Sequence, residues 1–193
     1  MEKTSVQKLA GVLKLLVTIT FICNLVALFL VPGCSRLRSL DELVEGALYF
    51  SNESSLAVTA RMMGYFVSAW QEVWLFGGPY AAVLTSFLLF CGGCTAVILW
   101  QARRVLDTIL AGNTFTFENA ANMRRAAVCC FLISAAALGR TVWGLCFYRS
   151  LMPLLTYNAL FVPIFLMAGL LCMVMSALFR QAAELKAEND LTI

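Results

Sequence analysis

No charged residue interrupts residues 153–179, which read PLLTYNALFVPIFLMAGLLCMVMSALF. About 20 apolar helical residues cross the roughly 30 Å hydrocarbon core of a bilayer, so this run is long enough to span one. Three further apolar runs of similar character lie at residues 9–31, 79–100 and 126–147. The four runs predict an all-α fold, an integral membrane four-helix bundle in a lipid bilayer, formed as a single membrane domain over residues 1–193.

The composition supports lipid as the solvent for most of this chain. The 193 residues are 61% hydrophobic and 13% charged, whereas soluble domains carry about 25% charged residues. The formal net charge is only +3, so we expect no direct binding to nucleic acid. Histidine is absent from the sequence, which removes the usual zinc and haem ligand and the usual general base. We therefore expect a non-enzymatic protein without a metal or cofactor.

Lysine and arginine predict the orientation, because they concentrate in cytoplasmic loops. One set of flanks holds most of them: Lys3, Lys8, Arg103, Arg104, Arg124, Arg125, Arg180 and Lys186. This asymmetry predicts an N-in, C-in protein of the cytoplasmic membrane. It has a short cytoplasmic hairpin at 101–125, a cytoplasmic tail at 180–193 and an outer amphipathic helical loop at 33–78. Two interpretations of that loop stay open, a cap on the outer leaflet and a lid over a ligand site.

Two cysteines in the second span lie three residues apart, as Cys91-Gly92-Gly93-Cys94. The spacing resembles a redox motif, but such motifs work near a βαβ pattern with access to soluble partners. Within a bilayer a thiolate is poorly solvated. We therefore interpret the cysteines as packing residues, and Gly92 and Gly93 as positions that allow helices to approach closely.

Arg140 lies within the third apolar run, where a charge is costly and marks a candidate functional site. Polar residues of the other runs come to a similar depth, which predicts an intramembrane polar layer: Asn24, Thr85, Ser86, Arg140 and Asn158. The layer is either an interhelical lock or a site for the head group of a small anionic or polar ligand.

The hairpin carries helix-end signals. We expect the second helix to continue to about Leu110, with Gly112 as its C-terminal cap. Thr116 suits the N-cap of the next helix, and Glu118 lies near the positive end of that helix.

Two motifs carry a family resemblance. Gly112, Phe115, Thr116, Glu118 and Asn119 match a Gly-x-Pro-Phe-Thr-x-Glu-Asn type of loop, with Thr114 in place of the usual proline. The C-terminal residues 184–192, ELKAENDLT, match a second motif. On these motifs the sequence resembles DUF2975, a family of bacterial membrane proteins of unknown function with four predicted helices. Genes of that family often lie beside one for a Cro/CI-type helix-turn-helix regulator, so the resemblance implies such a regulator as a cytoplasmic partner.

Both motifs are expected on one side of the membrane, where together they would form a docking surface. Its candidate residues are Gly112, Phe115, Thr116, Glu118, Asn119, Glu184, Lys186, Glu188, Asn189 and Asp190. Helix capping and interface anchoring explain the same residues without a partner. The first functional hypothesis is a sensor or regulatory partner that acts through this surface. The alternative is a small transporter, channel or immunity-like protein with a polar pocket around Arg140, in which a homodimer would supply the helices that one copy lacks.

Overall fold

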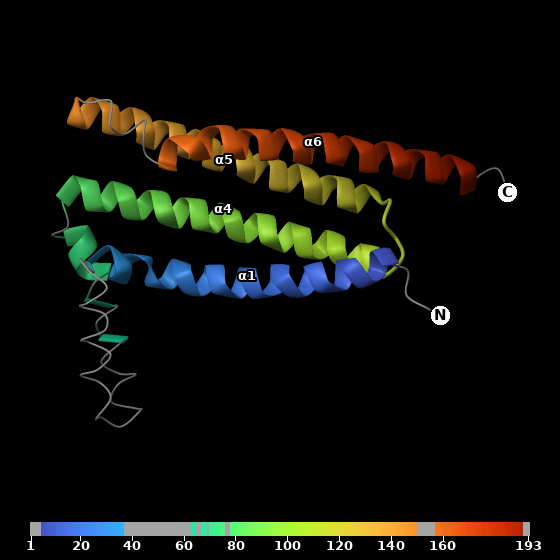
Figure 1. Cartoon of the computed structure of the whole chain (residues 1–193), viewed down its shortest axis with the longest axis horizontal. Coiled ribbons are helices and arrows are strands. Elements are labelled where there is room, and N and C mark those ends of the chain that lie inside the picture. Colours follow the sequence, from blue (N-terminus) through green and yellow to red (C-terminus); the bar gives the residue numbers. More distant parts are fainter. Residues whose placement is uncertain are drawn as a thin grey trace, which may run out of the picture. The chain divides into compact units, whose positions relative to one another are not determined.

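The computed structural model describes residues 5–36, 63–64, 67–68, 70–75, 78–149 and 157–190. Four long helices account for most of them: α1 Ser5–Arg36, α4 Gly78–Leu110, α5 Phe117–Tyr148 and α6 Tyr157–Asp190 (Figure 1). Every described residue outside 111–116 and Arg149 is helical, and none of the described residues is in a strand. The all-α prediction is confirmed.

Each long helix contains a segment that is long and apolar enough to cross a membrane: Gln7–Val31, Ala81–Leu110, Phe117–Phe147 and Ala159–Asn189. The chain is thus a multi-pass membrane protein. Helices α4 and α5 extend beyond the predicted apolar runs, because helical backbone continues up to the turn that joins them. Most of the predicted outer loop lies outside the described residues, although residues 70–75 are helical.

The chain divides into two compact units. The first unit joins Met1–Leu25 to Phe90–Ile193, and the second comprises Val26–Leu89. In the second unit, the indole Nε1 of Trp70 donates a hydrogen bond to the carbonyl oxygen of Phe29 at 3.4 Å.

Helices α5 and α6 pack antiparallel in the first unit. Ser176 Oγ donates to the carbonyl oxygen of Ala120 at 2.7 Å, and Ser134 Oγ donates to that of Val162 at 2.9 Å. The contact on α5 moves from Ala120 to Ser134 while the contact on α6 moves back by the same number of residues, from Ser176 to Val162. This pattern is that of an antiparallel pair. These bonds pass from side chain to backbone, so the two helix axes lie close together.

The parts of α1 and α4 in the first unit are antiparallel by the same test. Lys14 Nζ lies 2.6 Å from Asp107 Oδ1, and the ring centroids of Phe21 and Trp100 lie 6.0 Å apart. As a result, the start of α1, the α4–α5 hairpin and the end of α6 lie at one end of this unit (Figure 1).

Candidate functional site

The α4–α5 hairpin begins with a Schellman motif at the end of α4. Gly112 has a φ of +81°, a conformation that glycine adopts without the steric cost of a Cβ atom. Its N–H donates to the carbonyl oxygen of Ile109 at 3.1 Å, and the N–H of Asn113 donates to that of Thr108 at 3.0 Å. The two bonds satisfy carbonyl groups that the helix leaves without partners. The prediction that Gly112 caps α4 is confirmed.

The next helix begins at a conventional N-cap. Thr116 has extended backbone angles, and its hydroxyl oxygen accepts a hydrogen bond from the backbone N–H of Asn119. The predicted cap is therefore confirmed, and such a cap stabilises a helix by about 1 kcal/mol.

The Asn119 side chain closes the hairpin from inside. It is fully buried, and its Nδ2 donates to the carbonyl oxygen of Thr114 at 2.8 Å and to Thr108 Oγ1 at 2.6 Å. The Thr108 hydroxyl lies 2.7 Å from the carbonyl oxygen of Val105, to which it donates. A single amide thus links the last turn of α4, the loop and the first turn of α5. Asn119 contributes to any docking surface by holding its shape, since its side chain has no exposed atoms to offer.

Glu118 forms an ion pair on the outside of the same hairpin. Its Oε1 lies 2.7 Å from Arg104 Nη2 of α4. Both side chains are about half exposed, and pairs of this kind contribute about 0–1 kcal/mol because water and salt screen them. The pair orients the two helices more than it stabilises them.

Two large aromatic rings of the hairpin remain exposed. Phe115 is 51% exposed and Phe117 is 55% exposed. The Phe115 ring contacts Phe179 of α6, with the ring centroids 6.1 Å apart. The structure thereby brings the loop motif against the helix that continues into the C-terminal motif.

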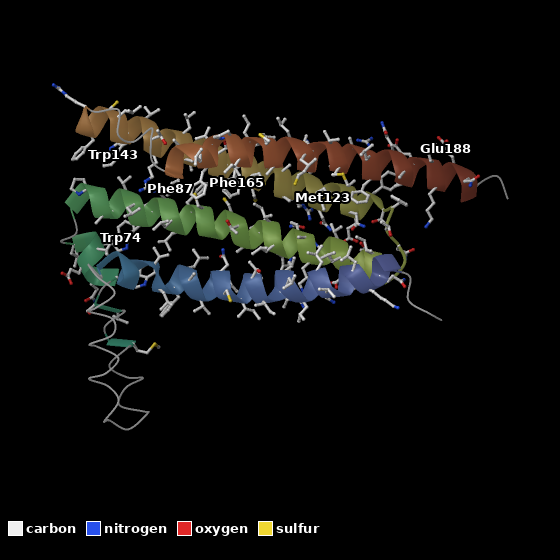
Figure 2. All side chains as sticks on the ribbon, in the orientation of Figure 1. Trp74, Phe87, Met123, Trp143, Phe165 and Glu188 are labelled. Atoms are coloured by element: carbon white, nitrogen blue, oxygen red, sulfur yellow. The ribbon has the colours of Figure 1, made fainter. Side chains whose placement is uncertain are left out.

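The C-terminal motif is the last part of α6, which runs to Asp190. Its side chains Glu184, Lys186, Glu188 and Asn189 are exposed, and Figure 2 labels Glu188 on this part of α6. The Asp190 side chain lies outside what the structure describes. Glu184 Oε1 accepts a hydrogen bond from Arg180 Nε at 2.9 Å, one turn earlier in α6. The motif therefore presents an exposed, charged helix beside the exposed rings of the hairpin.

The predicted polar layer is distributed over both units. Asn24, Arg140 and Asn158 belong to the first unit, and Thr85 and Ser86 to the second. The layer as a whole stays a prediction.

Individual members of the layer differ in their surroundings. Arg140 is half-buried and lies near Cys91 of α4. Ser86 Oγ donates to the carbonyl oxygen of Ala82 in its own helix, so its hydroxyl proton is already used. Asn24 Oδ1 and Thr85 Oγ1 are buried and have no hydrogen-bond partner among the described residues. The Asn158 side chain lies outside the described residues.

Sequence reasoning missed two buried polar residues, one on each of the helices that the hairpin joins. Gln101 of α4 and Asn122 of α5 are both buried. Gln101 Oε1 and both polar atoms of Asn122 have no hydrogen-bond partner among the described residues. The available signal was the spacing, because Gln101 and Thr108 lie two helical turns apart and Asn119 and Asn122 one turn apart, each pair on one helix face.

Lys14 of α1 forms an ion pair with Asp107 of α4, with Nζ 2.6 Å from Oδ1. The partner was not visible from the sequence because the two residues are far apart in the chain.

Seven cysteines whose side chains the structure describes are free thiols: Cys23, Cys91, Cys94, Cys129, Cys130, Cys146 and Cys172. No three cysteine, aspartate or glutamate side chains within the described ranges come together as a metal site requires. The expectation that Gly93 permits close helix approach is wrong, because a Cβ atom at that position meets no atom within 4 Å. The close approach is instead at Gly169 of α6, where an added Cβ would lie 2.7 Å from the ring of Phe131.

A family model described as "Protein of unknown function (DUF2975)" matches residues 58–193, well over half of the chain. No curated protein matches the chain, and no solved structure matches it.

Proposed function

Because the chain belongs to the DUF2975 family of proteins of unknown function, we propose a function from the hairpin itself: a non-enzymatic sensor or regulator of the bacterial cytoplasmic membrane. It binds a cytoplasmic protein partner through the hairpin and the end of α6. The partner class proposed is a small helix-turn-helix regulator, which the membrane protein holds or releases.

One observation carries the proposal. A fully buried amide, Asn119, holds the hairpin shut, while Phe115 and Phe117 stay more than half exposed on it. Exposed aromatic rings on a rigid support are the side chains that most often anchor protein interfaces. The charged end of α6 lies beside them through the contact between Phe115 and Phe179, and it would supply the polar rim of such an interface.

The side of the membrane follows from the lysine and arginine distribution, which favours the cytoplasm for the hairpin and both termini. Helix capping and anchoring at the membrane interface would explain only the cap residues of the hairpin. They would not account for an exposed, charged α6 end that continues beside the aromatic loop.

A pull-down of the helix-turn-helix regulator encoded beside the gene tests the proposal. We expect full-length protein to retain the regulator, deletion of residues 188–193 to abolish retention, and Phe115→Ala to weaken it about ten-fold, as loss of an interface anchor does. Phe147→Ala is the matched control, because Phe147 is a similarly exposed ring at the opposite end of α5 that also contacts an aromatic neighbour, Trp143.

Two outcomes count against this function. Normal retention by the truncated protein at matched expression refutes the docking role of α6. Loss of insertion or folding on truncation shows that the tail is structural.

The second candidate is a ligand pocket around Arg140, in a small transporter, channel or immunity-like protein. The observation in its favour is a half-buried arginine within a membrane-spanning helix, where a charge is costly. Binding or flux that depends on Arg140 would favour this candidate over the regulator.

A further inference from the structure

A hollow of about 280 Å³ lies between α5 and α6 at the hairpin end of the first unit. Its lining comes from one face of each helix: Phe117, Ala120, Ala121, Arg124, Ser176 and Arg180. The two alanines leave the space open, and the bond from Ser176 to the Ala120 carbonyl group holds the helices together beside it. The hollow therefore lies beside a point where α5 and α6 are hydrogen-bonded to each other.

Both charged groups of the lining are guanidinium groups. Arg124 forms no ion pair with any residue in the described ranges. Arg180 uses its Nε to bind Glu184, and the pair is exposed to solvent. The Nη groups of Arg180 remain for a second acceptor, because a guanidinium offers five N–H donors in a planar fork. That fork matches the oxygens of a phosphate group.

The helix dipole adds to the positive potential. The hollow covers the first two turns of α5, which begins at Phe117. The N-terminus of a helix carries about half a positive elementary charge and favours anions. The one acidic side chain of that first turn, Glu118, is paired with Arg104.

The positions of the two arginines along α5 and α6 favour a lipid over a soluble anion as the ligand. Arg124 lies two residues before the apolar run at 126–147, and Arg180 directly follows the run at 153–179. The guanidinium groups therefore lie where the hydrocarbon ends and phospholipid head groups begin. Phe117 lines the same hollow and is 55% exposed, so it offers an apolar surface for the glycerol and upper acyl region next to the cationic one.

We propose that this α5–α6 hollow binds the phosphate group of an anionic phospholipid, with Arg124 and Arg180 as the phosphate ligands and Phe117 against the lipid's apolar part. Basic pockets between membrane helices are suited to such head groups. The lipid site shares Phe117 with the proposed docking surface, and Arg180 pairs with Glu184 of that surface. Its phosphate ligands, Arg124 and Arg180, are not docking residues, so the arginine variants test lipid binding separately from partner retention.

Native mass spectrometry of the full-length protein in detergent, titrated with phosphatidylglycerol, tests the proposal. We expect Arg124→Gln with Arg180→Gln to weaken phosphatidylglycerol binding about 25-fold, since each basic residue near an anionic surface is worth about a five-fold change. Arg125→Gln is the control for each single arginine substitution, because it removes one positive charge from an exposed neighbour that does not line the hollow. Binding of zwitterionic phosphatidylcholine should be weak in all variants.

A steric variant keeps the test independent of charge. Ala121→Phe retains both arginines and fills the hollow, and it should weaken phosphatidylglycerol binding at least as much as a single arginine substitution. Size-exclusion profiles that match wild type establish that each variant is folded.

Two results overturn the proposal. One is a double variant that loses no more affinity than Arg125→Gln. The other is inorganic phosphate binding to the wild type as tightly as phosphatidylglycerol through the same arginines, which would make the hollow a site for a soluble anion.

Discussion

Asn119 joins three separate pieces of backbone through one side chain, and its removal should loosen the hairpin. Asn119→Ala leaves the half-buried Thr114 carbonyl group without this donor and removes one partner of the Thr108 hydroxyl group, which still donates to the Val105 carbonyl oxygen. Each unsatisfied buried group costs about 1–3 kcal/mol. We expect a clear loss of unfolding free energy, measured by thermal unfolding in detergent.

Asn113→Ala is the control for that experiment. Asn113 lies in the same turn, but its side chain is exposed, and only its backbone N–H takes part in the turn. Equal stability of the two variants would contradict the buried role of Asn119.

The effect of replacing Arg140 depends on the groups that directly surround its side chain. If it locks α5 to α4 near Cys91, Arg140→Leu orphans its polar partners and lowers the unfolding free energy by about 1–3 kcal/mol. If it binds a ligand, the variant loses binding while stability is retained. Thermal unfolding in detergent separates these outcomes, with Arg140→Lys as the control that keeps the charge. If Arg140→Leu changes neither stability nor binding, the guanidinium group only extends toward water at the membrane surface.

The two cysteines of the second span give a third residue-scale prediction. We expect Cys91→Ser combined with Cys94→Ser to leave folding and partner retention nearly unchanged, because free thiols within a helix bundle fill space. Loss of partner retention at normal expression would instead indicate thiol chemistry.

At the scale of helices, the α5–α6 pair depends on one close approach. A Cβ atom on Gly169 would lie 2.7 Å from the Phe131 ring, and a leucine side chain there requires the ring or the helix to move. Overpacking of this kind costs about 1–3 kcal/mol. We expect Gly169→Leu to lower the unfolding free energy by about that amount in a denaturant titration.

Gly139→Leu is the matched substitution on α5. A Cβ atom at Gly139 meets nothing within 4 Å, so the same change of residue type should leave the pair intact and add helix propensity. Destabilisation by Gly139→Leu equal to that of Gly169→Leu would show that backbone flexibility, and not packing against Phe131, is what the glycines provide.

At the scale of the whole molecule, the orientation in the membrane is the central prediction. The lysine and arginine distribution places the hairpin and both termini in the cytoplasm. On a cysteine-free background, Asn113→Cys should be protected from a membrane-impermeant thiol reagent in intact cells, and Gln71→Cys should react. Both positions have exposed side chains, so burial does not explain protection. Reaction of Asn113→Cys in intact cells would contradict the predicted cytoplasmic location of the hairpin.

The local features of this protein follow from short stretches of sequence. Long apolar runs determine the number of spanning helices, because about 20 apolar helical residues are needed to cross the hydrocarbon core of a bilayer. Gly112 and Thr116 determine where α4 stops and α5 starts, because caps depend on backbone groups within a few residues. These predictions needed no knowledge of the other helices.

The register between helices was decided only by the tertiary structure. Apolar side chains that face lipid and apolar side chains that face a neighbouring helix look alike in a sequence, since lipid is as apolar as leucine. Nothing local places Phe115 against Phe179, Lys14 against Asp107, or Arg124 and Arg180 around one hollow. These contacts depend on how the side chains of two facing helices fit together. For the same reason, the burial of Asn122 and Gln101 is evident only from the packed helices.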